Sequence, residues 1–250
     1  MPGKSSATAA AGAELPGYGG RARGASISLI IPVLNEAASI VALLETLQDW
    51  RGAGHELIVV DGGSHDGTPQ LAQKAASRVL RAERGRARQM NAGAAVVQGE
   101  WLLFLHADTY LPMSAAQSIV AADQAQWGWF DISLDHPGLM YGFIAWSMNR
   151  RARLTHVCTG DQAMFVRRQL FYRLAGFPDI PLMEDIAISK KLRRNSSPLV
   201  IAARATTSSR RWRQGGVFRT ILHMWKLRCL YFLGVDPERL VKEYYPDHGH

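Results

Sequence analysis

The stretch "LLFLHADTYLP", residues 102–112, runs from apolar residues into a histidine, an aspartate and a proline. The apolar start predicts a buried strand, and the polar residues after it have two explanations. Asp108 could be an ordinary turn residue, because Asp and Pro commonly close strands. Alternatively, the strand delivers the Asp108 carboxylate to the rim of a sheet, where ligands of open α/β folds bind. The rest of the chain has to decide between these readings.

Three similar units precede this stretch. "SISLIIPVL" (26–34), "ELIVVDGGSHDGT" (56–68) and "RVLRA" (78–82) are short apolar runs, and the first two end in polar or Gly-rich turns. Segments with helical spacing of apolar residues follow each run, over about 36–50, from Pro69 onward, and over about 86–98. Alternating strands and helices indicate parallel strands joined by crossovers, and continuous apolar runs indicate strands covered on both faces. We therefore predict a Rossmann-like α/β fold with a mixed, mostly parallel central sheet flanked by helices.

The rhythm changes after Pro112. "WGWFDISL" (127–134) alternates as a half-exposed strand does, a helix is predicted over 141–153, and "QAMFVRR" (162–168) is predicted to be another strand. A basic amphipathic helix is predicted over 217–235. These elements are expected to extend the same sheet and not to form a separate domain.

Composition sets outer bounds on the protein class. The chain has 250 residues, of which 47% are hydrophobic, enough for one sizeable core. Two distant cysteines indicate neither a disulfide framework nor a zinc site, and favour a reducing compartment. The formal net charge of +8 favours a polyanionic partner: nucleic acid, an anionic membrane or a phosphorylated ligand. Residues 1–25 are expected to be a disordered tail, and no apolar run is long enough to predict a membrane-spanning helix.

Polar groups collect where the predicted strands end. Asn35 and Glu36 follow the first strand, Asp61 the second, and His106 with Asp108 the fourth. A basic cluster lies at the start of the predicted 86–98 helix and consists of Arg81, Arg84, Arg86 and Arg88. A helix N-terminus is partly positive, so cations there make sense if an anion such as a diphosphate binds. The alternative is a solvated basic face.

Carboxylates that face a diphosphate would repel it unless a divalent cation lies between them. Mg²⁺ or Mn²⁺ prefers oxygen ligands, usually one or two carboxylates plus substrate phosphates. Asp108 suits that role and His106 could support it, although His106 could equally be a histidine satisfied in the wall. Asp61 ends an apolar run, and a carboxylate so placed can accept hydrogen bonds from a nucleobase.

Glu184 and Asp185 stand just before the amphipathic run of Ile186, Ile188 and Leu192. Acidic residues in the first turn of a helix commonly serve as caps. Capping is compatible with catalysis, because a capped helix end is a rigid platform. The residues alone leave both roles open.

Four motifs in order carry a resemblance to a known family. "SLIIPVLNEAASI", "ELIVVDGGSHDGT", "GRARQMNAGAAVVQGEWLLFLHADT" and "FPDIPLMEDIAIS" resemble the inverting family 2 glycosyltransferases, which adopt the glycosyltransferase A fold. The resemblance spans about residues 26–212. The wording of "HADT", "TGDQAMFVRR" and "FPDIPLMED" is most similar to the bacterial radical-SAM/selenodomain-associated subgroup.

The resemblance implies roles for matched positions. It implies Asp185, beside Glu184, as the catalytic base, and Asp108 as the metal ligand that ends the DXD motif, whose first acid is replaced here by His106. Arg211 and Trp212 match only part of the QXXRW element of processive members. The positions implied to bind the nucleotide sugar are Pro32, Asn35, Glu36, Asp61, Gly63, Arg86, Asn91, Ala107, Arg211 and Trp212.

The resemblance also implies an organisation and a set of partners. A catalytic domain over 26–215 has a nucleotide-binding half (26–112) and an acceptor half (113–215), followed by a C-terminal amphipathic helix and tail (216–250). The donor would be a UDP- or GDP-sugar with Mn²⁺ or Mg²⁺, and the acceptor is left open, with a lipid-linked hydroxyl as one option. The expected location is cytoplasmic, with peripheral contact at the inner membrane face through the C-terminal helix, unless that helix only closes the core.

Two other functions stay open from the residues. A sugar-phosphate nucleotidyltransferase would use a similar sheet, metal and nucleotide, but "PVLNEAAS" is not the Gly-rich phosphate loop with Lys that such enzymes need. A non-enzymatic nucleotide- or nucleic-acid-binding protein would explain the net charge. However, the basic residues are not interleaved with aromatic residues in a recognisable motif, and no nucleic-acid partner is expected.

Overall fold

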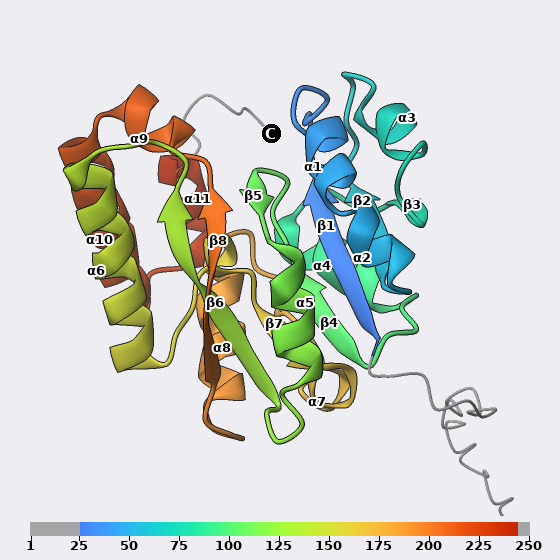
Figure 1. Ribbon diagram of the computed structural model, residues 1–250. Helices are drawn as coiled ribbons and strands as arrows, with labels where there is room; N and C mark the ends of the chain where they lie inside the picture. The colour runs from blue at the N-terminus through green and yellow to red at the C-terminus, as the bar shows by residue number, and fades with distance from the viewer. Residues whose placement is uncertain (1–25, 245–250) are drawn as a thin grey trace, which may run out of the picture.

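The computed structural model describes residues 26–244. Within them one eight-stranded sheet runs through the molecule in the order β3-β2-β1-β4-β7-β6-β8-β5 (Figure 1). The strands are β1 (Ile27–Val33), β2 (Glu56–Asp61), β3 (Arg78–Arg81), β4 (Trp101–Phe104), β5 (Thr109–Tyr110), β6 (Trp127–Leu134), β7 (Phe165–Arg167) and β8 (Leu199–Thr207).

The N-terminal half is the parallel part of the sheet. β1 pairs in parallel with β2 on one side and with β4 on the other, and β2 pairs in parallel with β3. β7 is antiparallel to both β4 and β6, β8 is parallel to β6, and β5 is antiparallel to β8. The prediction of a mixed, mostly parallel α/β sheet is confirmed. The carboxyl ends of β1 and β2 meet at one edge, with Val33 opposite Asp61.

Helices cover both faces of the sheet (Figure 1). One apolar cluster joins one face to α1, α2 and α5, and another joins the opposite face to α4, α7 and α8. The helices are α1 (Ile40–Thr46), α2 (Gln48–Gly52), α3 (Thr68–Ala72), α4 (Arg86–Ala94), α5 (Met113–Val120), α6 (Leu139–Thr155), α7 (Arg168–Arg173), α8 (Glu184–Leu192), α9 (Arg210–Gly215), α10 (Val217–Phe232) and α11 (Pro237–Tyr244).

The predicted half-exposure of residues 127–134 is wrong for the first part of β6. Trp127, Trp129 and Phe130 are fully buried, because β6 lies inside the sheet with apolar side chains packed on both of its faces. Asp131 and Ser133 are partly exposed beyond a register shift between Phe130 and Asp131. The alternating pattern arises because the first part of β6 is buried in the core, whereas the second part is partly exposed at Asp131 and Ser133.

The C-terminal helices pack onto the body of the molecule. Leu227 of α10 and Leu240 of α11 share a small core with Met183 and Ile186, which flank the start of α8. The predicted 217–235 helix is thus seen as α10, whereas the predicted tail over 1–25 lies outside the described residues. Between residues 26 and 244, no helix is both long and apolar enough to cross a bilayer.

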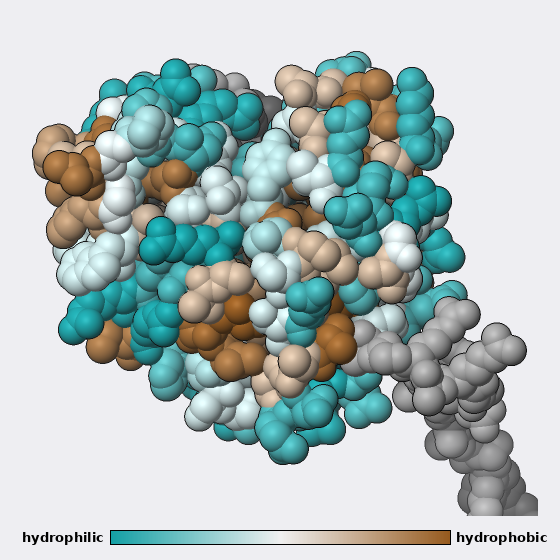
Figure 2. Space-filling model, in the orientation of Figure 1, coloured by the Kyte–Doolittle hydropathy of each residue, from teal (hydrophilic) through white to brown (hydrophobic). Residues whose placement is uncertain are grey.

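Large apolar side chains also reach the surface. They are most numerous on α6 and α10, and Figure 2 shows brown and tan groups at the left edge, over the upper ends of these two helices. These exposed apolar side chains lie outside the core that the sheet and its covering helices form. Packing of that core therefore does not explain them.

Candidate active site

Two loops at the carboxyl ends of β1 and β2 are clamped together. The backbone N–H of Asn35 donates to Ser64 Oγ (2.8 Å), and Asn35 Oδ1 accepts from the N–H of His65 (3.0 Å). The N–H of Glu36 donates to Thr68 Oγ1 (2.9 Å). Asn35 has a left-handed φ of 55°, which Asn tolerates better than most residues. Asn35 and Glu36 therefore lie at the rim where the sequence places them.

Asp61 closes the Gly-rich turn after β2. Its side chain is 3% exposed and accepts hydrogen bonds from the N–H groups of Gly63 (3.0 Å) and Ser64 (3.1 Å). Gly63 has a φ of 95°, a conformation that favours glycine. Pro32 lies in β1 one position before the end of the strand and is partly exposed. The structure assigns Asp61 a turn-closing role, and its contact with a base stays a prediction.

Gln89 ties the ends of β1 and β2 together. Its buried amide nitrogen donates to the carbonyls of Val33 and Val60, both at 2.8 Å. The sequence analysis missed this residue, although it lies within the "GRARQMNAG" motif. A polar residue on the buried face of an amphipathic helix was the available signal.

The basic cluster at the start of α4 divides into two parts. Arg88 is paired with Glu83 (2.9 Å) and Asp179 (2.8 Å), so two acids compensate its charge. Arg86, the first residue of α4, lies close enough to Glu184 and Asp185 for its charge to lower the pKa of both carboxyls. Arg86 therefore lies on the side of the acidic pair.

Asn91 anchors the segment that leads to α8. Its amide nitrogen donates to the carbonyl of Phe177 (2.8 Å), and its Oδ1 accepts from the N–H of Phe177 (3.0 Å). Both polar atoms of the side chain are thus used in holding the backbone. The predicted role of Asn91 near the nucleotide has no support from this pairing.

His106 and Asp108 follow β4 as the sequence predicts. The His106 ring lies against Gly160, where a Cβ would overlap it, and its Nδ1 is 3.5 Å from Asp161 Oδ1. Ala107 is buried, whereas Asp108 is partly exposed, and its carbonyl accepts from the N–H of Ser208 (3.1 Å). The loop after β4 is therefore held by the segment after β8.

Glu184 and Asp185 begin α8 next to the same loop. The N–H of Gly160 donates to Asp185 Oδ2 (3.0 Å), and Asp185 Oδ1 accepts from the N–H of Ile186 (2.7 Å). A narrow hollow beside them is lined by Met90, Phe104, His106, Gly160, Met164, Phe177, Glu184 and Asp185. The structure thus brings together the two acids and His106, which are far apart in sequence.

Burial controls the protonation of this acidic pair. Glu184 is 5% exposed, and burial followed by the neighbouring Asp185 charge raises its pKa to about 7. Burial also raises the pKa of Asp185, while the N–H groups of Gly160 and Ile186 and the charge of Arg86 oppose that rise. Two backbone N–H donors stabilise the ionised form of the Asp185 carboxylate. An ionised carboxylate with a raised pKa suits a general base.

The residues after β4 can bind a divalent cation only when a bound substrate supplies further ligands to the metal. Among residues 26–244, no group of three or more His, Cys, Asp or Glu side chains is arranged to hold a metal ion. The Asp108 carboxylate is partly exposed and accepts a 3.5 Å hydrogen bond from Thr109 Oγ1. One carboxylate plus substrate phosphates is a usual way to bind Mg²⁺. This donor set fits a cation that binds with a diphosphate.

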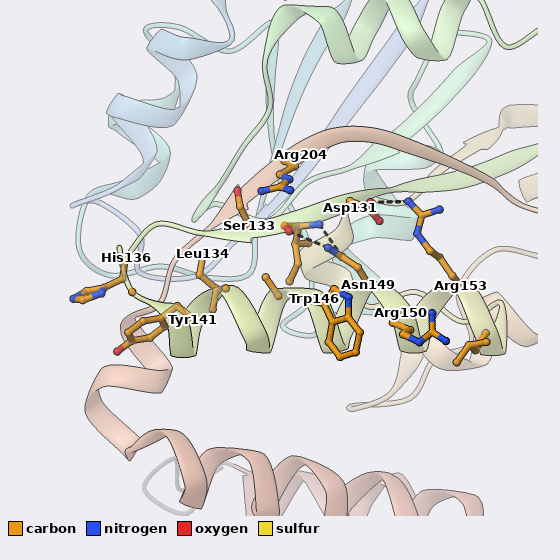
Figure 3. A pocket seen from close by; sticks show the side chains of 15 residues that line it. Asp131, Ser133, Leu134, His136, Tyr141, Trp146, Asn149, Arg150, Arg153 and Arg204 are labelled. Atoms are coloured by element: carbon orange, nitrogen blue, oxygen red, sulfur yellow. Dashed lines mark hydrogen bonds and ion pairs between the residues drawn. The ribbon is translucent and has the colours of Figure 1, made fainter.

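The C-terminal half contains a larger cavity of about 470 Å³ between α6 and the strands β6 and β8. Figure 3 shows Asn149 of α6 pairing with the backbone of β6, and Arg153 of α6 forming an ion pair with Asp131 (2.6 Å). Arg204, from β8, lines the same cavity. None of the predicted site residues lines it.

The short helix α9, which contains Arg211 and Trp212, follows β8. The N–H of Ser209, just before α9, donates to Asp135 after β6 (2.8 Å). Trp212 is partly exposed. Helix α9 therefore lies past the carboxyl ends of β6 and β8, and not beside β1 and β2 (Figure 1).

Three residues near the acidic pair were missed by the sequence analysis. Gly160 binds Asp185, Asp161 approaches His106, and the charge of Asp185 acts on the pKa of Arg151, which burial lowers. Gly160 and Asp161 belong to the "TGDQ" motif, which could have signalled them. Arg151 carried no such signal, because only the packing of α6 brings it to the site.

Comparisons with known proteins identify the fold. The fold is the glycosyltransferase A fold, shared with the mannosyltransferase PcManGT from Pyrobaculum calidifontis, solved with GDP-Man and Mn²⁺ (TM-score 0.59, 21% identity, 83% of this chain and 61% of that one). Residues 28–128 match the family model described as Glycosyl transferase family 2. The first half of the chain thus carries the sequence pattern of that family.

Curated relatives point the same way. The chain is 31% identical over 156 residues to a PGL/p-HBAD biosynthesis glycosyltransferase of Mycobacterium tuberculosis (58% of this chain, 60% of the relative). It is 32% identical over 107 residues to an undecaprenyl-phosphate 4-deoxy-4-formamido-L-arabinose transferase of Aeromonas hydrophila (38% and 33%). The chain spans about 60% of the length of the first of these relatives and a third of the second.

Proposed function

We propose that this protein is an inverting glycosyltransferase that moves a sugar from a nucleoside-diphosphate sugar to an acceptor hydroxyl. One observation carries the proposal: Glu184 and Asp185, buried at the start of α8, lie beside the loop that carries His106 and Asp108 and within the field of Arg86. The family match and the glycosyltransferase names of the relatives support this function over a nucleotidyltransferase or a nucleic-acid-binding module.

The proposed reaction is a single displacement. Asp185 accepts the proton of the acceptor hydroxyl as its oxygen attacks the anomeric carbon. The bond from that carbon to the diphosphate oxygen breaks, and its electron pair leaves with the diphosphate. Arg86 stabilises negative charge in the site. The hydrogen bonds from Gly160 and Ile186 fix the orientation of the Asp185 carboxylate.

Asp108, supported by His106, would hold a divalent cation, Mn²⁺ or Mg²⁺. When bound, such a cation neutralises charge on the leaving diphosphate. The Asp161 carboxylate, 3.5 Å from His106 Nδ1, orients the His106 ring. The mannosyltransferase of the same fold was solved with GDP-Man and Mn²⁺, which supports a metal-assisted UDP- or GDP-sugar donor here.

The remaining expectations form part of the proposal. Pro32, Asn35, Glu36, Gly63 and Ala107 line the donor side, and the catalytic domain spans 26–215. The chain belongs to the radical-SAM/selenodomain-associated subgroup and works in the cytoplasm, peripherally at the inner membrane face. An acceptor linked to a lipid agrees with the undecaprenyl-phosphate transferase among the relatives.

Calorimetric titration of the full chain with UDP, GDP, CMP and dTDP tests the donor site. Each nucleotide is measured with Mn²⁺, with Mg²⁺ and with excess EDTA. We expect one diphosphate to bind with metal and to lose most of its affinity in EDTA. Binding of none of them, or binding that ignores metal, would contradict the proposal.

A further inference from the structure

Helix α6 presents an apolar stripe to solvent. Leu139, Phe143, Trp146 and Leu154 recur at the spacing of one helical face, and their exposed fractions range from 57% to 96%. The opposite face is buried through Ile144, Ala145 and Ala152. A monomer surface normally exposes single large apolar residues and not a continuous row of them.

Helix α10 repeats this arrangement. Phe218, Leu222, Trp225 and Phe232 follow the same spacing and are 60% to 73% exposed. The buried face of α10 is fixed to the body through Leu227, in the core shared with Met183 and Ile186. Both stripes are therefore carried by helices whose other faces are already packed.

The two helices lie next to each other on the side of the molecule away from β1 and β2 (Figures 1 and 3). We define the docking surface as Leu139, Phe143 and Trp146 of α6 with Phe218, Leu222 and Trp225 of α10. It includes two exposed tryptophans, a residue type enriched at membrane–water interfaces.

Basic side chains predominate on the helices around the docking surface. Helices α6, α9 and α10 contain nine Arg and Lys residues and no Asp or Glu, and two of the nine pair with acids of neighbouring elements, Arg153 with Asp131 and Lys226 with Glu243. Arg150, next along the α6 stripe, and Arg219, beside Phe218, are both exposed. A partner that is complementary to the docking surface must present an anionic outer layer with an apolar layer beneath it.

We propose that α6 and α10 together dock the protein onto the surface of an anionic lipid bilayer. The aromatic and leucine side chains enter the boundary between head groups and acyl chains, and the flanking arginines contact lipid phosphates. A second copy of this chain fits less well, because a symmetric dimer would set the two sets of cations against each other. The proposal does not depend on the proposed glycosyltransferase activity.

The docking surface borders the large cavity of the acceptor half. Trp146, Arg150 and Leu154 belong to the α6 stripe and also line the cavity between α6, β6 and β8. Docking would therefore place the mouth of this cavity at the lipid surface. If the proposed function is correct, a lipid-linked acceptor would reach the enzyme along this side.

Flotation of the full chain with lipid vesicles tests the proposal. We expect binding to vesicles of equal parts phosphatidylcholine and phosphatidylglycerol, weaker binding in high salt, and little binding to phosphatidylcholine alone. No binding to the mixed vesicles would overturn the proposal.

Paired substitutions test each helix separately. Phe143→Ser with Trp146→Ser on α6, and Leu222→Ser with Trp225→Ser on α10, should each reduce the partition coefficient about tenfold or more. The matched control is Val41→Ser, which changes an apolar residue exposed elsewhere, on α1. If only the α10 substitutions reduced vesicle binding, the proposed role of α6 would be overturned. If the control reduced vesicle binding equally, the proposed roles of both helices would be overturned. Thermal melts confirm that the variants fold.

The charge contribution has its own test. Arg150→Gln with Arg219→Gln should reduce binding to mixed vesicles roughly 30-fold, since each basic residue near an anionic surface contributes a factor of about five. Arg51→Gln with Arg173→Gln, exposed on α2 and α7, is the control and should leave binding unchanged. Sedimentation velocity addresses the alternative partner. A dimer abolished by the same serine substitutions, without vesicle binding, would assign the surface to a second copy.

Discussion

The backbone N–H of Gly160 donates to Asp185 Oδ2 over 3.0 Å, while the other side of Gly160 lies against the ring of His106. One glycine thus spaces the acid at the start of α8 from the histidine after β4. This contact joins the C-terminal half of the chain to the loop after β4, which carries His106 and Asp108.

Asp185→Asn should lower turnover by about 10²–10⁴-fold and leave donor binding unchanged, because the amide cannot accept the acceptor proton. Release of the nucleoside diphosphate and calorimetric donor binding measure the two effects. Asp49→Asn removes an acid from the first turn of α2 and serves as the control. Turnover within threefold or so of the native rate would remove Asp185 from the base role.

Asp108→Ala should weaken nucleotide binding in Mn²⁺ or Mg²⁺ to the level seen in EDTA, because it removes the exposed carboxylate after β4. The decisive quantity is the ratio of dissociation constants with and without metal. A ratio equal to that of the native protein would exclude Asp108 as a ligand. Asp123→Asn, which changes a surface acid after α5, is the control.

Glu184→Gln should change the pH dependence of stability. Because burial raises the pKa of Glu184 from 4.5 to about 7, the folded state favours its protonated form. Protonated Glu184 therefore makes its full contribution to the free energy of unfolding below pH 4.5. This contribution is lost as the pH rises from 4.5 towards 7, at up to about 1.4 kcal/mol per pH unit. The Glu184→Gln variant should not lose stability in this way, because its glutamine side chain does not titrate.

Denaturant unfolding of both proteins between pH 4.5 and 8 measures this difference. The exposed Glu45→Gln variant should follow the native curve. If the native and Glu184→Gln curves stay parallel over this range, Glu184 titrates normally in the fold.

Gly160→Ala should reduce both stability and turnover. A Cβ at this position overlaps the His106 ring, and relieving such overpacking typically costs about 1–3 kcal/mol. Gly142→Ala, in α6 with no atom near the added Cβ, should instead be neutral or stabilising by up to about 1 kcal/mol. Melting temperatures compare the two, and equal behaviour would show that the packing at His106 is loose.

Cys229 should react with a thiol reagent in the native protein, while Cys158 should not. Cys229 is exposed, whereas burial raises the pKa of the Cys158 thiol to about 12. Only a thiolate attacks such reagents. Cys229→Ser should abolish the fast reaction of the native protein, and a remaining fast thiol would show that α8 opens around Cys158.

The parallel half of the fold was predictable because its strands are continuous apolar runs that end in turn residues. Strand β8, which lies between β6 and β5, was missed because "LVIAARATT" mixes alanine and arginine, and only its pairing with these neighbours makes it a strand. β6 was judged half-exposed because Asp131 and Ser133 alternate with apolar residues. Trp127 and Trp129 gave no sign that another layer covers them.

The candidate site was predictable where motif residues supply charge, as at Asp185, Asp108 and Arg86. Residues that position those groups were harder to find. Gln89 and Asn91 act through backbone carbonyls and amides of distant segments, and no local pattern identifies those partners. Arg151 lies within range of the Asp185 charge only because α6 packs one face against the body of the molecule.

Helix α6 therefore has an outer face in solvent and an inner face whose Arg151 acts on Asp185. Such a helix can couple two equilibria, the binding of a ligand to its outer face and the protonation of Asp185. Thermodynamic coupling of this kind is reciprocal. Any ligand of the outer face that moves Arg151 relative to Asp185 must shift the protonation of that carboxyl. Protonation of Asp185 must then alter the affinity for that ligand by the same factor.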